Sequence, residues 1–138
     1  MPARKLWWGV AVGTVAALPL GRLLFRIAEQ SMAPALLPGD YVLTLPARNR
    51  LRRGDVVVFE HPLRPGFYLV KRVIGLPGDT LDGEDCGRLG PDQVFVLGDQ
   101  GAWSADDGRT LGPLPSRALR WRVVLRVWPP HRVGRPRP

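Results

Sequence analysis

Cysteine, histidine and lysine are scarce in this chain of 138 residues, and each scarcity excludes a kind of site. Cys86 is the only cysteine, so neither an intrachain disulfide nor a cysteine-based zinc site can form. The two histidines, His61 and His131, are far apart in the sequence and make no clustered pair of metal ligands. We therefore expect no metal ion and no other cofactor. Only two basic residues are lysines, Lys5 and Lys71, so Lys71 is the single lysine beyond the N-terminal segment.

Acidic residues are also few, and the formal charge of +8 is unevenly distributed. An excess of three positive charges lies in residues 1–30 and another three in residues 129–138, which leaves two for the rest of the chain. Positive charge beside an apolar segment or in a Pro/Arg tail suits anionic lipid headgroups better than a DNA-reading surface. We therefore expect a lipid bilayer as a partner and no nucleic acid. A lipid or nucleic-acid binder acting through arginine stretches such as 48–53 is an alternative.

An apolar run from Leu6 to Phe25 is interrupted by charge only at Arg22. As a helix this run would extend roughly 30 Å, about the thickness of the hydrocarbon core of a bilayer, with Arg22 snorkelling. Trp7 and Trp8 lie at one end, where aromatic rings prefer the headgroup region. We predict one uncleaved transmembrane helix, about 6–25, within an N-terminal region 1–28. A cleaved signal peptide and a buried core helix are the alternatives.

After Gln30, short apolar runs alternate with Gly, Pro and Asp, a pattern typical of a turn-rich antiparallel β domain. We predict a mainly β, antiparallel β-sheet domain over 29–128, followed by a flexible Pro/Arg tail over 129–138. The expected strands are Tyr41–Leu45, Val56–Phe59, Phe67–Ile74, Val94–Leu97 and Leu119–Trp128.

Ser31 and Lys71 are the two residues whose settings favour chemistry. Ser31 follows the apolar run in a proline-punctuated stretch that could hold a nucleophile, although a capping or turn role is the commoner one for a serine. Strand alternation places Lys71 on one face with Phe67, Leu69 and Val73. Desolvation would lower the pKa of this lysine from ~10.4, and its neutral amine could then take the proton of a serine hydroxyl. The alternatives are a lysine that snorkels outward from an edge strand and a Ser-His-Asp triad built with one of the histidines.

Four sequence blocks occur in a characteristic order behind the apolar segment. The blocks are Ser31–Leu36 followed by Pro38-Gly39-Asp40, then Arg53–Phe59, then Tyr68–Asp79, and last Val96–Asp99 continuing through Ser104, Asp106, Arg109 and Gly112. Together they resemble the type I signal peptidases, a family of Ser-Lys dyad endopeptidases. The resemblance implies a largely antiparallel β domain whose apolar surface lies against the membrane. The short separation of the last two blocks resembles the minimal, single-anchor form of the family.

The resemblance also implies a role for each matched residue. Ser31 would attack the scissile carbonyl, with its backbone N–H stabilising the oxyanion, and Lys71 would activate first the serine and then the deacylating water. The supporting residues would be Ser104, which orients the lysine, the pairs Arg72 with Asp99 and Asp106 with Arg109, which brace the site, and Met32, which contacts substrate. The departures from the family pattern are Glu29, where Gly or Ser is usual, Ala35 in place of Thr, Gln100 in place of Asn, and a spacing from Asp106 to Arg109 that is one residue longer than usual.

The implied activity is removal of N-terminal signal peptides from exported preproteins by a serine endopeptidase of the cell (inner) membrane. The resemblance implies a single-pass protein with its catalytic domain on the extracytoplasmic side. Preprotein signal peptides and the bilayer are the expected partners, and the secretion machinery or a partner subunit is a further candidate. The alternatives are a catalytically silent membrane-tethered subunit or scaffold and a maturation peptidase dedicated to one substrate.

Overall fold

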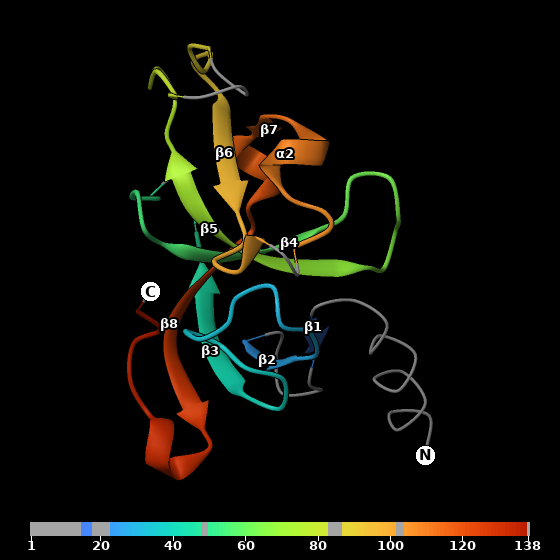
Figure 1. Ribbon diagram of the computed structural model, residues 1–138, viewed down its shortest axis with the longest axis vertical. Helices are drawn as coiled ribbons and strands as arrows, with labels where there is room; N and C mark the ends of the chain where they lie inside the picture. The colour runs from blue at the N-terminus through green and yellow to red at the C-terminus, as the bar shows by residue number, and fades with distance from the viewer. Residues whose placement is uncertain (1–14, 18–22, 48–49, 83–86, 102–103, 138) are drawn as a thin grey trace.

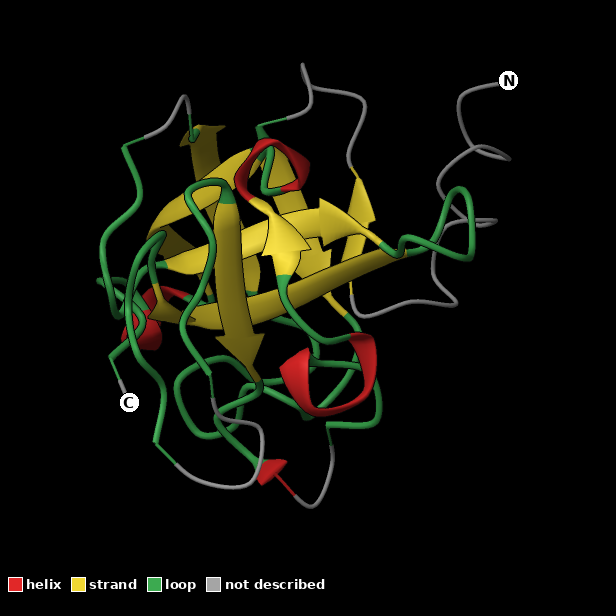
Figure 2. Ribbon diagram, turned by 90° about the horizontal axis from the view of Figure 1, so that it is seen from above, coloured by secondary structure: helices red, strands yellow, loops and turns green. Residues whose placement is uncertain are grey.

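Antiparallel strands make up most of the computed structural model, which describes residues 15–17, 23–47, 50–82, 87–101 and 104–137 (Figure 1). The mainly β prediction is confirmed. The strands are β1 (Val15–Ala17), β2 (Leu24–Ile27), β3 (Tyr41–Pro46), β4 (Val56–Glu60), β5 (Tyr68–Gly75), β6 (Gln93–Leu97), β7 (Leu114–Pro115) and β8 (Trp121–Trp128). The short helical segments α2 (Gly108–Leu111), η2 (Ser116–Ala118) and η3 (Pro130–Arg132) lie at the margins of this strand core (Figure 2).

The sheet order is β1-β2-β3-β8-β4-β5-β6-β7, so the last strand lies between β3 and β4. All pairings are antiparallel. The five predicted strands correspond to β3, β4, β5, β6 and β8, with ends that differ by at most a few residues. Because β8 joins β3 to β4, residues from both halves of the chain are held in one sheet.

Alternating residues of the central strands pack into two hydrophobic clusters. Strand β4 serves both, since Val56 and Val58 belong to one cluster and Val57 and Phe59 to the other. Period-two alternation with both faces apolar is the pattern of a strand buried on each side. The first cluster contains Phe25, Ile27, Met32, Leu36, Val42, Val56, Val58, Val70, Trp121 and Val123, and the second contains Val57, Phe59, Leu69, Val73, Val94, Val96, Leu114 and Leu119.

The predicted transmembrane helix differs from the structure at both described parts of the run, where Val15–Ala17 and Leu24–Ile27 form the paired strands β1 and β2. Phe25 and Ile27 are fully buried in the first cluster. These apolar side chains therefore lie on the buried face of a strand and not on one side of a helix. An apolar run alone does not distinguish a helix from a buried strand. Residues 6–14 and 18–22 of the prediction lie outside the described residues. Within the described ranges, no helix has the length and hydrophobicity needed to cross a bilayer.

The Pro/Arg tail also differs from its prediction as a flexible extension, because its described residues 129–137 are held against the domain. Arg132 donates to both carboxylate oxygens of buried Asp40 at 2.9 Å, and Gly134 pairs with Arg126 of β8. The Pro136 carbonyl accepts from the Arg72 guanidinium at 3.4 Å. Hydrogen bonds from guanidinium groups to buried acceptors hold this segment in place. The composition of the tail does not show where those acceptors lie.

Candidate active site

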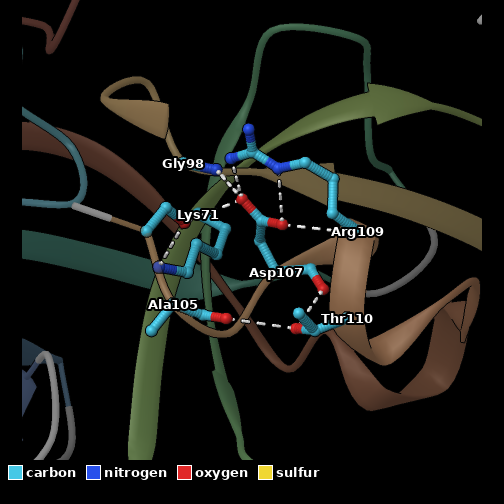
Figure 3. Close-up of polar contacts among 7 residues, drawn as sticks. Lys71, Gly98, Ala105, Asp107, Arg109 and Thr110 are labelled. Carbon is cyan, nitrogen blue, oxygen red and sulfur yellow. Dashed lines mark hydrogen bonds and ion pairs between the residues drawn. The ribbon is translucent and has the colours of Figure 1, made fainter. Parts of the chain in front are cut away.

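Lys71 lies in the middle of β5 with a side chain that is only 1% exposed. Its neighbours on the same face, Leu69 and Val73, belong to the second hydrophobic cluster, as strand alternation predicted. The amine donates to Ser104 Oγ at 3.1 Å (Figure 3). This contact fixes the end of a flexible side chain inside an apolar wall. The alternative of a solvent-exposed edge lysine is therefore wrong.

Burial lowers the pKa of Lys71, because desolvation penalises the ammonium form. The negative charges of Asp107, Glu29 and Asp106 act in the opposite direction, and burial outweighs them. A lysine with a lowered pKa exists as the neutral amine in a larger fraction of molecules at a given pH. The β5 position thus provides the electronic condition for a general base.

Ser31 is 1% exposed, and its Oγ has no hydrogen-bond partner among the described residues. Its carbonyl accepts from the Gln100 N–H at 2.9 Å, which attaches the serine loop to the segment after β6. Gly98 lies between this loop and the lysine's partner: a β-carbon at that position would lie 2.8 Å from the Ser31 carbonyl oxygen and 2.3 Å from Ser104 Oγ. The fold therefore brings the first, third and fourth sequence blocks together.

The acidic residue that contacts both Ser104 and Arg109 is Asp107 rather than Asp106. The Asp107 carboxylate is fully buried and accepts from Ser104 Oγ at 2.7 Å and from the Gly98 N–H at 3.1 Å (Figure 3). It also accepts from Arg109 Nη2 at 2.6 Å. The prediction for Asp106 was wrong by one residue. The sequence carried the signal, because Asp107-Gly108-Arg109 restores the shorter Asp-x-Arg spacing of the family.

Asp107 remains ionised despite its burial. Burial alone would raise its pKa, but hydrogen bonds from Arg109, Gly98 and Ser104 outweigh that effect and hold the pKa well below the usual range. Ser104 gives its only hydroxyl proton to this carboxylate, so a lone pair of its oxygen faces the Lys71 amine. The hydrogen-bond chain from Lys71 through Ser104 to Asp107 therefore fixes the direction in which the lysine nitrogen donates.

Asp106 points to a different partner, with Oδ2 3.6 Å from Nε2 of the buried His61. The Leu63 N–H donates to His61 Nδ1 at 3.0 Å, so the two ring nitrogens face the backbone and Asp106. His131 lies in η3 and is exposed. Among the described residues neither a histidine nor Lys71 hydrogen-bonds to Ser31 Oγ, so the Ser-His-Asp alternative has only the contact of His61 with Asp106 in its favour.

The remaining predicted residues are placed as follows. Arg72 donates to both carboxylate oxygens of Asp99, at 2.8 and 2.7 Å, which is a bidentate pair directly after Gly98. Met32 is fully buried in the first hydrophobic cluster, so its contact with a substrate stays a prediction. Within the described ranges, no three His, Cys, Asp or Glu side chains gather into a candidate metal site.

Replacing Gly98 by alanine should disturb this arrangement directly. The added methyl group would meet Ser104 Oγ at 2.3 Å and the Ser31 carbonyl oxygen at 2.8 Å, so one of the two segments must move. We expect a loss of about 1–3 kcal/mol in the free energy of unfolding, as for other overpacked sites. Chemical denaturation measures it. Gly87→Ala is the matched control, because a β-carbon there meets nothing within 4 Å. Equal stabilities of the two variants would contradict the close packing of the serine loop on Ser104.

Comparisons with known proteins agree with the four blocks. The profile of the family described as "Signal peptidase, peptidase S26" matches residues 7–87. Mitochondrial inner membrane protease subunit 1 of Schizosaccharomyces pombe is 33% identical over 141 residues, covering 88% of this chain and 87% of that protein.

Two further relatives extend this similarity. Mitochondrial ATP-independent inner membrane protease subunit 1a of Arabidopsis thaliana is 34% identical over 116 residues, which cover 75% of this chain and 69% of that protein. Signal peptidase I of Buchnera aphidicola is 40% identical over 73 residues, which cover 42% of this chain and 24% of that protein. The chain therefore belongs to the signal peptidase family, peptidase S26.

Proposed function

We propose that this protein is a serine endopeptidase that removes N-terminal signal peptides, with Ser31 as nucleophile and Lys71 as general base. The observation that carries the proposal is the buried Lys71 residue, 1% exposed, whose amine is held at 3.1 Å from Ser104 Oγ in a fold that packs the Ser31 loop on Gly98 beside Ser104. Because the amine donates to Ser104, its lone pair in the neutral state points away from that hydroxyl. Glu29, two residues before Ser31, acts electrostatically on the same amine.

The proposed reaction follows the logic of an activated nucleophile. Lys71 Nζ takes the proton of Ser31 Oγ as this oxygen attacks the scissile carbonyl carbon. The resulting ammonium returns the proton to the leaving amine, the C–N bond breaks and an acyl-enzyme forms. Lys71 then takes a proton from a water molecule as the water oxygen attacks the ester carbonyl carbon. The ester C–O bond breaks, the ammonium returns the proton to Ser31 Oγ, and the carboxyl product leaves. The Ser104 and Asp107 contacts hold the amine in place through both halves.

We place the protein at an inner membrane, with its apolar N-terminal segment as the attachment and its site on the extracytoplasmic side. The names of the relatives support this, since two of them are called inner membrane protease subunits. The word subunit in those names also supports a partner subunit for this chain. Preprotein signal peptides are the proposed substrates.

The test uses the purified full chain in neutral detergent micelles. A peptide with alanine at positions −1 and −3 should be cut at one bond, and a matched peptide with phenylalanine at −1 should not. A serine-directed acylating probe should label Ser31, as read by mass spectrometry of the digested protein. Both signals should be absent from Ser31→Ala and present in Ser116→Ala, which removes a hydroxyl outside the site. A folded chain that neither cuts nor labels would instead favour the silent-subunit alternative.

A further inference from the structure

Six arginine residues line one cavity of about 490 Å³, and one of them is Arg72, the residue that follows Lys71 in β5. Successive residues of a strand point to opposite faces, so this cavity lies across the sheet from the Lys71 side chain. The arginines are Arg52 and Arg53 from the loop before β4, Arg72 from β5, Arg122 from β8, and Arg135 and Arg137 from the C-terminal segment. Asp55 is the single carboxylate among the described residues that line it.

Only part of this positive charge is neutralised within the protein. Arg53 pairs with Asp79 at 2.5 Å, and Arg72 pairs with Asp99 at 2.7 Å. In the described part of the chain, the other four arginines of the wall make no ion pair with a carboxylate. Like charges held together repel unless a counter-charge lies among them. The cavity therefore favours an anion.

Arg122 supplies the sharpest sign of a missing acceptor. Its Nε is buried and has no hydrogen-bond partner among the described residues. Buried donors in folded proteins are almost always satisfied, because an unmade hydrogen bond costs the full desolvation of the group. Arg122 also lines two adjoining cavities, one with Arg50 and Arg52 and one with Leu45 and Arg50. Arg122 thus lies where the three arginine-lined cavities meet.

We propose that this cavity binds a phosphate-bearing ligand, with Arg52, Arg122 and Arg135 as its principal contacts. A carboxylate can be bound fully by one guanidinium group. A phosphate or diphosphate has more acceptor oxygens and more negative charge, so it can bind several guanidinium groups at once. The volume lies in the range of small-molecule sites and exceeds what a bare ion fills. The shared chemistry is that of a phospholipid headgroup and of a soluble diphosphate.

The C-terminal segment forms one wall of the site. It lies beside β8 (Figure 1), where Arg132 is bound to Asp40 and the Pro136 carbonyl accepts from Arg72. These contacts hold the backbone that carries Arg135 and Arg137 against the cavity. The arginine-rich tail therefore has a structural reason to be ordered that is separate from peptide cleavage.

The test measures binding of inorganic pyrophosphate to the full chain in neutral detergent by titration calorimetry. A parallel titration uses short-chain phosphatidylglycerol in the same micelles, with phosphatidylcholine as the neutral lipid. Arg52→Gln/Arg122→Gln should weaken binding about 100-fold, because each charged contact is worth about tenfold. Arg64→Gln/Arg117→Gln removes the same charge outside the cavity and should leave the affinity within about twofold. The tail variant Arg135→Gln, at an exposed position, should weaken it about tenfold without affecting folding.

Each outcome decides the proposal. Binding of pyrophosphate that is lost in the cavity variants supports a site for soluble phosphates, and the same pattern with phosphatidylglycerol alone supports a headgroup site. Equal weakening by the cavity and control pairs would overturn the proposal, since the binding would then follow net charge. Saturable binding of an oligonucleotide without either phosphate probe would also overturn it.

Discussion

Replacing Lys71 by methionine should lower kcat for peptide cleavage by about 10²- to 10⁴-fold, the usual contribution of a positioned general base. Methionine keeps an unbranched apolar side chain in the buried position on β5 and removes the amine that contacts Ser104. Leu69→Met is the matched control, because it places the same side chain on the same face of β5 and should leave kcat nearly unchanged. Full activity in Lys71→Met would refute the Ser-Lys dyad.

The same substitution should stabilise the protein at neutral pH. Burial lowers the pKa of Lys71 below its ordinary 10.5, so between the two values the unfolded chain binds more protons than the folded one. The free energy of unfolding of the wild type therefore rises with pH across that window, by at most about 1.4 kcal/mol per pH unit. Lys71→Met lacks this rise. Its advantage over the wild type should be greatest below the lowered pKa and should shrink toward pH 10.5.

The pH dependence of peptide cleavage should also report the titration of Lys71. Only the neutral amine accepts the proton of Ser31, so kcat/KM should increase with pH through the lowered pKa of Lys71 and then level off. The rise should be complete below the ordinary lysine pKa of 10.5. An acidic limb at the ordinary value would mean that the amine is hydrated during catalysis.

Much of this site could be predicted from the sequence because its parts are local patterns. Alternation in the run around Lys71 specified the buried face, and five strands followed from apolar runs between turn residues. Strands β1 and β2 escaped prediction because Leu6 to Phe25 is apolar at almost every position, which hides the period. The two-residue strand β7 is too short to show any period.

Charged hydrogen bonds outside the strand pattern were the part that the sequence analysis did not predict. The ordered C-terminal segment depends on Arg132 reaching Asp40, a pair separated by 92 residues. The choice between Asp106 and Asp107 depends on which carboxylate faces Ser104, and two adjacent acids in a loop before a short helix carry no periodic signal. The first interaction crosses the fold, whereas Asp107 bonds Ser104 and Arg109 only three and two residues away. In both places a charged hydrogen bond, rather than a periodic pattern, decides the structure.

Asp107→Asn should lower both the stability and the activity of the protein. Asp106→Asn should have only a small effect on either. Asp107 is buried and its carboxylate accepts hydrogen bonds from Ser104, Gly98 and Arg109. An amide replaces one acceptor oxygen by a donor, which leaves some of these groups unpaired. We expect a loss of about 3 kcal/mol in the free energy of unfolding, measured by denaturant titration. Asp106 is partly exposed, and its carboxylate lies 3.6 Å from His61 Nε2, so we expect less than about 1 kcal/mol there.

The kinetic result separates a bracing role from a merely structural one. Asp107→Asn frees the Ser104 hydroxyl from its acceptor, so Lys71 loses its fixed partner and kcat should fall at least about tenfold, while KM changes little. The negative charge of Asp107 raises the pKa of Lys71, so its removal should also move the acidic limb of the pH profile to lower pH. A purely structural residue would lower the amount of active protein without moving that limb. If Asp106→Asn instead gave the large losses, the carboxylate that faces Ser104 would have been assigned one residue too late.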